Sequence, residues 1–150
     1  MALRLSTGLR QALLGTASFD ATFTACFINI YTGTQPATAD TAASGTLLAT
    51  IYSNNPTDTL GLNFDVPAVA GTISKAVAET WAGTALATGT AGWYRLYTAT
   101  GDAPSVLSTT ASRIDGNIST SGANMNMSST TITTGTVQTI STFDIALPAS

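Results

Sequence analysis

The sequence of 150 residues contains no histidine, a single cysteine and few charged residues, which amount to 9% of the chain. Without histidine the chain lacks the commonest general base and the commonest neutral metal ligand, so a histidine-based catalytic triad within it is excluded. Cys26 has no second cysteine for an intrachain disulfide or a CxxC metal site, and it lies in the apolar run from Phe23 to Ile30. We therefore predict a buried structural cysteine, no metal site and no cofactor.

Positive charge and long apolar segments are also scarce. The five basic residues are scattered, the formal net charge is -3 and the pI is about 4.4, so no basic patch for nucleic acid is expected. No stretch approaches the ~20 consecutive apolar residues that cross a bilayer. Arg10 interrupts the apolar part of the N-terminal segment before it reaches the length of a signal peptide. The sequence predicts neither a nucleic-acid partner nor a membrane partner.

The carboxylates are too few and too dispersed to suggest a hydrolase. The chain has one glutamate and seven aspartates, and a glycosidase-type site needs two carboxylates in one cleft. Asp102 and Asp115 are the pair to inspect, but each adjoins a glycine in a predicted turn, where aspartate is favoured for backbone reasons. Asp115-Gly116-Asn117 resembles the start of a calcium loop whose other ligands are missing. We expect no catalytic residue and no enzymatic activity.

Threonine and alanine take the place of the missing charges, with 29 and 24 copies. Threonine favours extended backbone and keeps an outward face hydrated without charge. Among the predicted strands only Lys75 offers the lysine that usually protects a strand edge from pairing with another chain. A neutral surface with unprotected edges suits permanent contact, so we expect the edges to be occupied by neighbouring molecules.

The chain begins with a predicted short helix over residues 6–14. Ser6 or Thr7 can cap its N-terminus, Leu9 and Leu13 lie one turn apart on one face, and Gly15 is placed to end it. A helix of about two turns is marginal alone. Its leucine face must therefore pack against its own domain or against a partner.

After residue 15 the apolar period changes from helical to two, the pattern of β-strands. Residues 75–80 fit either a strand or a single helical turn, and Pro67 is expected to end the strand before it. Glycine, proline, asparagine and aspartate clusters separate nine candidate segments, from which we expect about eight strands: 23–30, 47–51, 60–66, 71–75, 78–83, 92–98, 110–115, 124–128 and 137–147. This pattern predicts an all-β fold, an antiparallel β-sandwich or its jelly-roll variant, formed by residues 16–150 behind an N-terminal arm of residues 1–15.

Aromatic residues offer one candidate ligand surface. Trp81, Trp93, Tyr94 and Tyr97 could form a stacking platform for sugars, but Trp93, Tyr94 and Tyr97 lie on both faces of one strand and cannot all face a ligand. Core packing is the preferred interpretation. Arg95 shares a face with Trp93 and Tyr97, where it can stack on a ring or pair with a carboxylate.

The sequence resembles a family of small structural proteins encoded by tailed bacteriophages, similar to capsid cement or decoration proteins. The likeness extends over nearly the whole chain and lies in turns and strands. It is carried by MALRLSTGLRQALLG at positions 1–15, Ile30–Pro36 with Ala39-Asp40, Gly45–Leu48, Gly61–Phe64, Glu79–Trp81, Ala87–Trp93, Thr120–Ala123 and Asn126–Ser129. The resemblance implies a virion protein on the capsid exterior that binds the major capsid protein, as a dimer or trimer.

On this reading the N-terminal segment is the docking arm. Leu9 and Leu13 would pack on the partner, and Arg4 and Arg10 would pair with acidic capsid groups. The alternative is that the same helix covers its own sandwich. Two other functions stay open: a tail, neck or adaptor component of the virion, and a module on its surface that binds sugars or a receptor.

Overall fold

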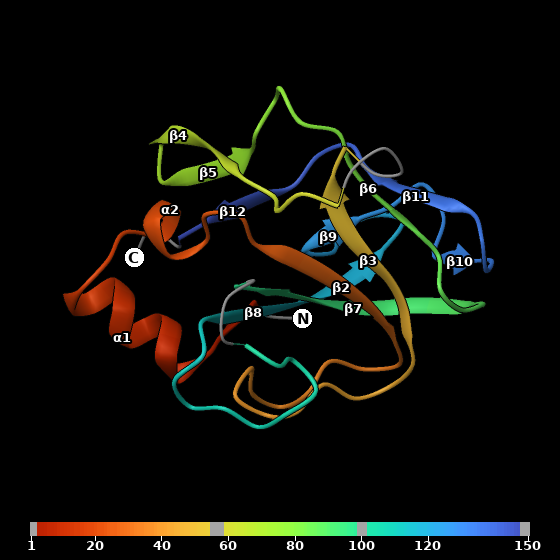
Figure 1. Ribbon diagram of the computed structural model, residues 1–150, viewed down its shortest axis with the longest axis horizontal. Helices are drawn as coiled ribbons and strands as arrows, with labels where there is room; N and C mark the ends of the chain where they lie inside the picture. The colour runs from red at the N-terminus through yellow and green to blue at the C-terminus, as the bar shows by residue number, and fades with distance from the viewer. Residues whose placement is uncertain (1–2, 55–58, 99–101, 148–150) are drawn as a thin grey trace.

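The computed structural model describes residues 3–54, 59–98 and 102–147. It confirms the predicted all-β fold of antiparallel sheets with a short N-terminal helix (Figure 1). The elements in chain order are β1 (Arg4–Leu5), α1 (Thr7–Gly15), α2 (Phe19–Thr22), β2 (Phe27–Thr32), β3 (Leu47–Ser53), β4 (Phe64–Val69), β5 (Thr72–Lys75), β6 (Trp81–Thr84), β7 (Gly89–Tyr97), β8 (Arg113–Ser119), β9 (Met125–Asn126), β10 (Thr131–Ile132), β11 (Val137–Ile140) and β12 (Asp144–Ala146).

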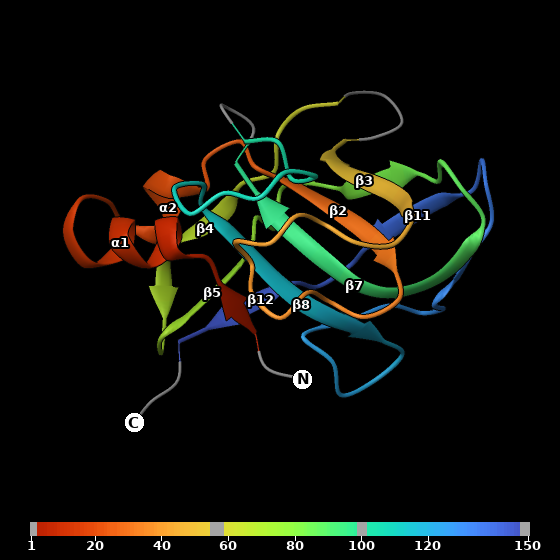
Figure 2. The ribbon, with the colours of Figure 1, turned by 90° about the horizontal axis from the view of Figure 1, so that it is seen from below.

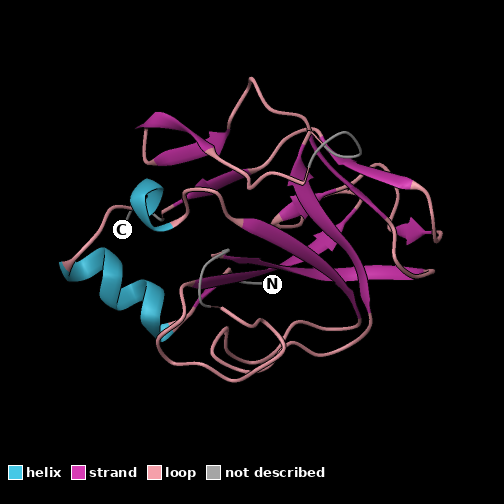
Figure 3. Cartoon of the chain, in the orientation of Figure 1, coloured by secondary structure: helices cyan, strands magenta, loops and turns pink. Residues whose placement is uncertain are grey.

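Two sheets make up the fold. The larger has the strand order β1-β8-β7-β2-β3-β6-β11, with β9 paired to β8 and β10 paired to β7, and the smaller has the order β12-β5-β4. All pairs are antiparallel except β8 with β9. Figure 2 shows that α1, α2 and the small sheet lie at one end of the molecule and β11 at the other, and Figure 3 shows both helices together at the first end. Neither helix in the described part of the chain has the length and apolar character that a membrane crossing requires.

The large sheet buries both of its faces, with different chemistry on each. One face carries Ile28, Ile30, Tyr94, Leu96 and Ile114, which belong to the hydrophobic core shared with Phe64, Ile73 and Ile145 of the small sheet. The alternation of side chains along β7 and β8 sends Arg95, Arg113 and Asp115 to the opposite face, where all three are fully buried. We call these the apolar face and the polar face.

Two loops cover the polar face. Residues 33–46 join β2 to β3, and residues 102–112 precede β8. The loops are joined to each other by backbone hydrogen bonds from Ala43 N to the carbonyl oxygen of Pro104, 3.0 Å, and from Ser108 N to that of Asp40, 2.9 Å. The arginines on the sheet below them bind carbonyl groups of the second loop, so the polar face holds the loops in place.

The N-terminal segment is part of this sheet. β1 pairs with β8 in the register Arg4 with Asp115 and Leu5 with Ile114, so the predicted boundary at residue 15 separates segments that hydrogen bonds join. Ser6, rather than Thr7, caps α1: its Oγ accepts a hydrogen bond from Leu9 N, 3.2 Å. Gly8 lets the helix approach the backbone of Thr110, because any Cβ there would clash with that carbonyl group.

Several strands differ from the prediction. β4 continues through Pro67 to Val69, because β4 is an edge strand and the missing N–H of proline costs no ladder bond there. Of the four apolar residues in the strand predicted over 60–66, only Leu62 and Phe64 are buried. Leu60 forms an isolated bridge and is exposed, and Val66 lies on the exposed edge of the small sheet. Residues 76–80 form a turn and no helix.

The first and last predicted strands are also divided. Phe23 follows α2 and is buried ahead of β2, so β2 begins four residues later than the apolar run. Residues 137–147 do not form one strand: β11 belongs to the large sheet and β12 to the small one, and the chain crosses between them at residues 141–143. Periodicity alone could not show a strand changing sheets.

Candidate partner-binding site

A cleft of about 620 Å³ lies beside the edge strand β1, where the N-terminal segment, the first loop and the end of β12 meet. Its lining is mostly apolar and includes two cations and one carboxylate. The lining residues are Leu3, Arg4, Leu5, Arg10, Ala37, Thr38, Asp40, Ala146 and Leu147. The cleft therefore brings together Arg4 and Arg10, two of the four side chains that the sequence predicted to bind a partner.

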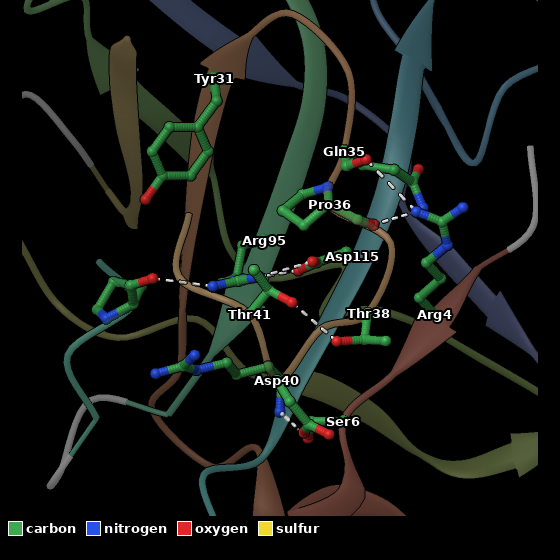
Figure 4. Close-up of polar contacts among 12 residues, drawn as sticks. Arg4, Ser6, Tyr31, Gln35, Pro36, Thr38, Asp40, Thr41, Arg95 and Asp115 are labelled. Carbon is green, nitrogen blue, oxygen red and sulfur yellow. Dashed lines mark hydrogen bonds and ion pairs between the residues drawn. The ribbon is translucent and has the colours of Figure 1, made fainter. Parts of the chain in front are cut away.

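Arg4 lies at the wall formed by the first loop. Its Nη1 donates to the carbonyl oxygen of Pro36 and, at 3.4 Å, to that of Gln35 (Figure 4). These bonds to neutral carbonyl groups orient the guanidinium without neutralising it. The positive charge of Arg4 is therefore available to a carboxylate that enters the cleft.

Asp40 forms no ion pair with Arg4 or Arg10, and its two oxygens are bound to the start of α1. Oδ1 accepts from Thr7 N, 2.8 Å, and Oδ2 accepts from Thr7 Oγ1, 2.7 Å. A carboxylate in this place is favoured by the free N–H groups and the positive dipole end of a helix. Arg10 is exposed and donates from Nη2 to Thr7 Oγ1, 3.0 Å, so this hydroxyl links it to Asp40.

The other basic residues have different partners. Arg95 and Arg113 form ion pairs with Asp115 and Asp102, at 2.7 and 2.5 Å, and these are the two ion pairs within residues 3–54, 59–98 and 102–147. Lys75 donates to the carbonyl oxygens of Ala76 and Glu79 and lies over the ring of Trp81. The cleft thus holds the two arginines that the described fold leaves without an ion-pair partner.

The structure separates the two predicted leucines from the two arginines. Leu9 is 0% exposed and belongs to the core, and Leu13 is half-buried against that core. The helix turns the Leu9 side chain into its own domain, which fits the alternative that this helix covers its own sandwich. Leu14, which the sequence analysis did not single out, is 89% exposed instead.

The carboxylates inspected as a catalytic pair are held in two separate ion pairs. Arg95 binds Asp115 through Nε and Nη2, both at 2.7 Å, and Arg113 binds Asp102 in the same two-pronged way. Burial raises the pKa of Asp115, while the hydrogen bonds and charge of Arg95 oppose the rise. The predicted pairing of Arg95 with a carboxylate is confirmed, and its guanidinium also lies 5.4 Å from the centre of the Trp93 ring. Within the described ranges no three residues of the metal-ligating types His, Cys, Asp and Glu lie together.

The remaining candidates are structural. Trp81, Trp93 and Tyr94 are buried, which confirms core packing over a sugar platform for these three, and Tyr97 is half-buried. Cys26 is buried as predicted, and burial raises the pKa of its thiol well above the ordinary range. Sequence reasoning missed the role of Asp40, because no local pattern marks a carboxylate that caps a helix 33 residues away.

Comparisons with family models, with curated proteins and with solved structures each found no match for this chain.

Proposed function

We propose that this protein is a structural protein of a bacteriophage virion, a capsid cement or decoration protein that binds the outer surface of the major capsid protein lattice. The family resemblance in the sequence motivates the proposal. The observation that carries it furthest is the cleft beside β1, which combines apolar walls with two arginines that have no ion-pair partner in the described fold. The function needs no catalytic group.

The cleft suits a capsid segment in which a carboxylate adjoins an apolar side chain. Arg4 and Arg10 would bind the carboxylate, and Leu3, Leu5 and Leu147 would bury the apolar group. In this version of the docking mechanism the N-terminal segment acts as a fixed wall rather than as a free arm, because β1 and Leu9 are fastened to the domain. A single contact of this size is weak, and a gain through high effective concentration would require linked copies that occupy two lattice sites at once.

The first experiment is the copy number of this protein in purified virions, by quantitative mass spectrometry against the major capsid protein. We expect one copy per capsid subunit or a simple fraction of it. A handful of copies per particle would instead support a tail, neck or adaptor component and overturn the capsid-wide role.

The second experiment tests the cleft on capsids that lack the protein. Arg10→Glu should weaken binding at least tenfold at low salt, because it replaces an attraction with a repulsion. Arg10→Lys keeps the charge and is the matched control, for which we expect a loss of threefold or less. Equal binding by both variants would remove Arg10 from the docking mechanism.

A further inference from the structure

The strand edges of this molecule differ in how well they are protected from pairing with another chain. β1 has two residues and carries Arg4, β12 has three and carries Asp144, and β9 and β10 have two residues each. β4 carries Asp65 and Pro67, and its register with β5 shifts between Asp65 and Val69. Short length, charge, proline and bulges are the devices by which natural sheets avoid edge-to-edge association.

β11 carries no charged residue, no proline and no bulge. It ends the path of the large sheet, and its four residues pair with β6 in unbroken register from Val137–Thr84 to Ile140–Trp81. No described strand pairs with its other side. Val137 is 49% exposed, Thr139 is exposed, and Leu86 of the neighbouring turn is 60% exposed. An edge strand of this kind presents unpaired backbone N–H and C=O groups to solvent.

The chain segments that include β11 and its partner strand β6 carry no charged residue. The sequence has no Asp, Glu, Lys or Arg from position 116 to position 143, which includes β9, β10 and β11, nor from position 80 to position 94, which includes β6 and the start of β7. Figures 1 and 2 both place β11 at the end of the molecule away from α1. All charged residues therefore lie outside these two stretches.

We infer that β11 is a self-association edge, where β11 of a second copy of this chain pairs with it antiparallel about a two-fold axis. A second copy fits because the contact is isologous: each uncharged edge meets the same uncharged edge, with no like charges opposed. The net charge of -3 favours this end over others for meeting an identical molecule. The pairing joins two large sheets into one and buries Val137 of both copies.

This inference does not depend on the proposed function, and its test contains no capsid. The mass of the purified protein in solution is measured as a function of concentration by sedimentation velocity or light scattering. We expect a monomer–dimer equilibrium for the unaltered chain. A monomer at every concentration up to the millimolar range would overturn the inference.

A charge placed on the edge tests the location of the contact. Thr139→Lys should weaken dimerisation tenfold or more, because two lysines then meet across the two-fold axis. Thr109→Lys is the matched control: it adds the same charge at an exposed threonine in the loop before β8, and should leave the dimer unchanged. A dimer that survives Thr139→Lys and dissociates in Thr109→Lys would place the interface elsewhere.

Cysteine cross-linking gives a second readout that does not need the lysine variant to fold. Cys26 is buried, so an added cysteine is the one accessible thiol in the described part of the chain. Gln138→Cys and Thr139→Cys, one residue apart, should include one that forms a disulfide dimer under mild oxidation, since opposed residues in antiparallel strands have Cβ atoms about 4.5–5.5 Å apart. Thr109→Cys should not. Cross-linking at Thr109→Cys alone would contradict the inference.

Discussion

The two faces of the large sheet are made by the same strands and held by different forces. On β7, Leu96 enters the apolar core while its neighbour Arg95 is buried among charges and carbonyl groups. Apolar packing has no direction, so the apolar face joins the two sheets wherever shapes fit. The ion pairs and hydrogen bonds of the polar face are directional, so they fix two long loops in one conformation. The apolar face thus supplies cohesion, and the polar face positions the loop that walls the cleft.

The largest expected effect comes from breaking the polar face. Arg95→Met leaves Asp115 buried without its partner, and we expect a loss of about 3–5 kcal/mol in the free energy of unfolding. Removing Arg95 raises the pKa of Asp115 in the folded state further, so the folded variant favours the protonated carboxyl. The free energy of unfolding of the variant should therefore fall as pH rises through that pKa. The difference from the unaltered protein should be smaller at acid pH.

Urea denaturation across pH measures this effect, and the double variant Arg95→Met/Asp115→Leu is its control. With both charges gone, most of the stability should return, because the burial cost of the carboxylate disappears with it. If the double variant is as unstable as the single one, the loops depend on packing around Arg95 rather than on charge.

The apolar face should respond to truncation without any such rescue. Leu96→Ala on the same strand deletes fully buried methyl groups and leaves a cavity, for which we expect a loss of about 2–5 kcal/mol in the free energy of unfolding. The loss should not vary with pH between 5 and 8, since no ionisable group changes its surroundings. A pH dependence like that of Arg95→Met would mean that the two faces are not independent.

A smaller effect is expected where the N-terminal helix joins the sheet. Ser6 Oγ accepts from Leu9 N and Arg113 N and donates to the carbonyl oxygen of Ala111. Ser6→Ala should cost about 1–2 kcal/mol in the free energy of unfolding, because it removes a cap and leaves buried backbone groups unpaired. Ser18→Ala, which removes the exposed cap of α2, is the control and should cost less. Equal losses would mean that α1 is attached by its leucines alone.

The smallest effect at ordinary pH concerns the tyrosines of both faces. Burial raises the pKa of Tyr97 to about 12 on the polar side, and raises that of Tyr94 further on the apolar side. The unfolded phenol ionises near pH 10. The stability linked to these neutral phenols is therefore complete below pH 10 and is lost as pH rises through the folded pKa values. Spectrophotometric titration should show Tyr94 ionising only when the protein unfolds. Tyr94→Phe should remove the part of the alkaline loss of stability that comes from this phenol.

The alternation of apolar residues in Leu47–Ile51 and the aromatic strand around Trp93 predicted strands because side chains in a half-buried sheet follow a period of two. The same reasoning wrongly ended a strand at Pro67, which an edge strand tolerates. It also predicted one strand over residues 137–147, where the chain passes from one sheet to the other. Arg4 and Arg10 entered the predicted docking arm through the family resemblance and their charge, and the structure places both at the cleft. For Leu9 the sequence left two alternatives, because an amphipathic helix looks the same whether it covers its own core or a neighbour's, and the structure buries Leu9 in its own core.

The attachment of the helix also sets the order in which the chain can fold. Ser6 forms hydrogen bonds with Ala111 and Arg113, which lie 105 and 107 positions later in the chain, and among the described strands β1 pairs with β8 alone. The first fifteen residues also bond to the loop after β2, through Arg4 to Gln35 and Pro36 and through Thr7 to Asp40, but β1 takes its place in the sheet only when β8 is present. The small sheet is completed later than the large one, because its strand β12 follows all other strands in the chain and pairs with β5. Contacts that join distant parts of the chain make folding slow, so we expect the pairing of β1 with β8 and of β12 with β5 to be late steps in folding.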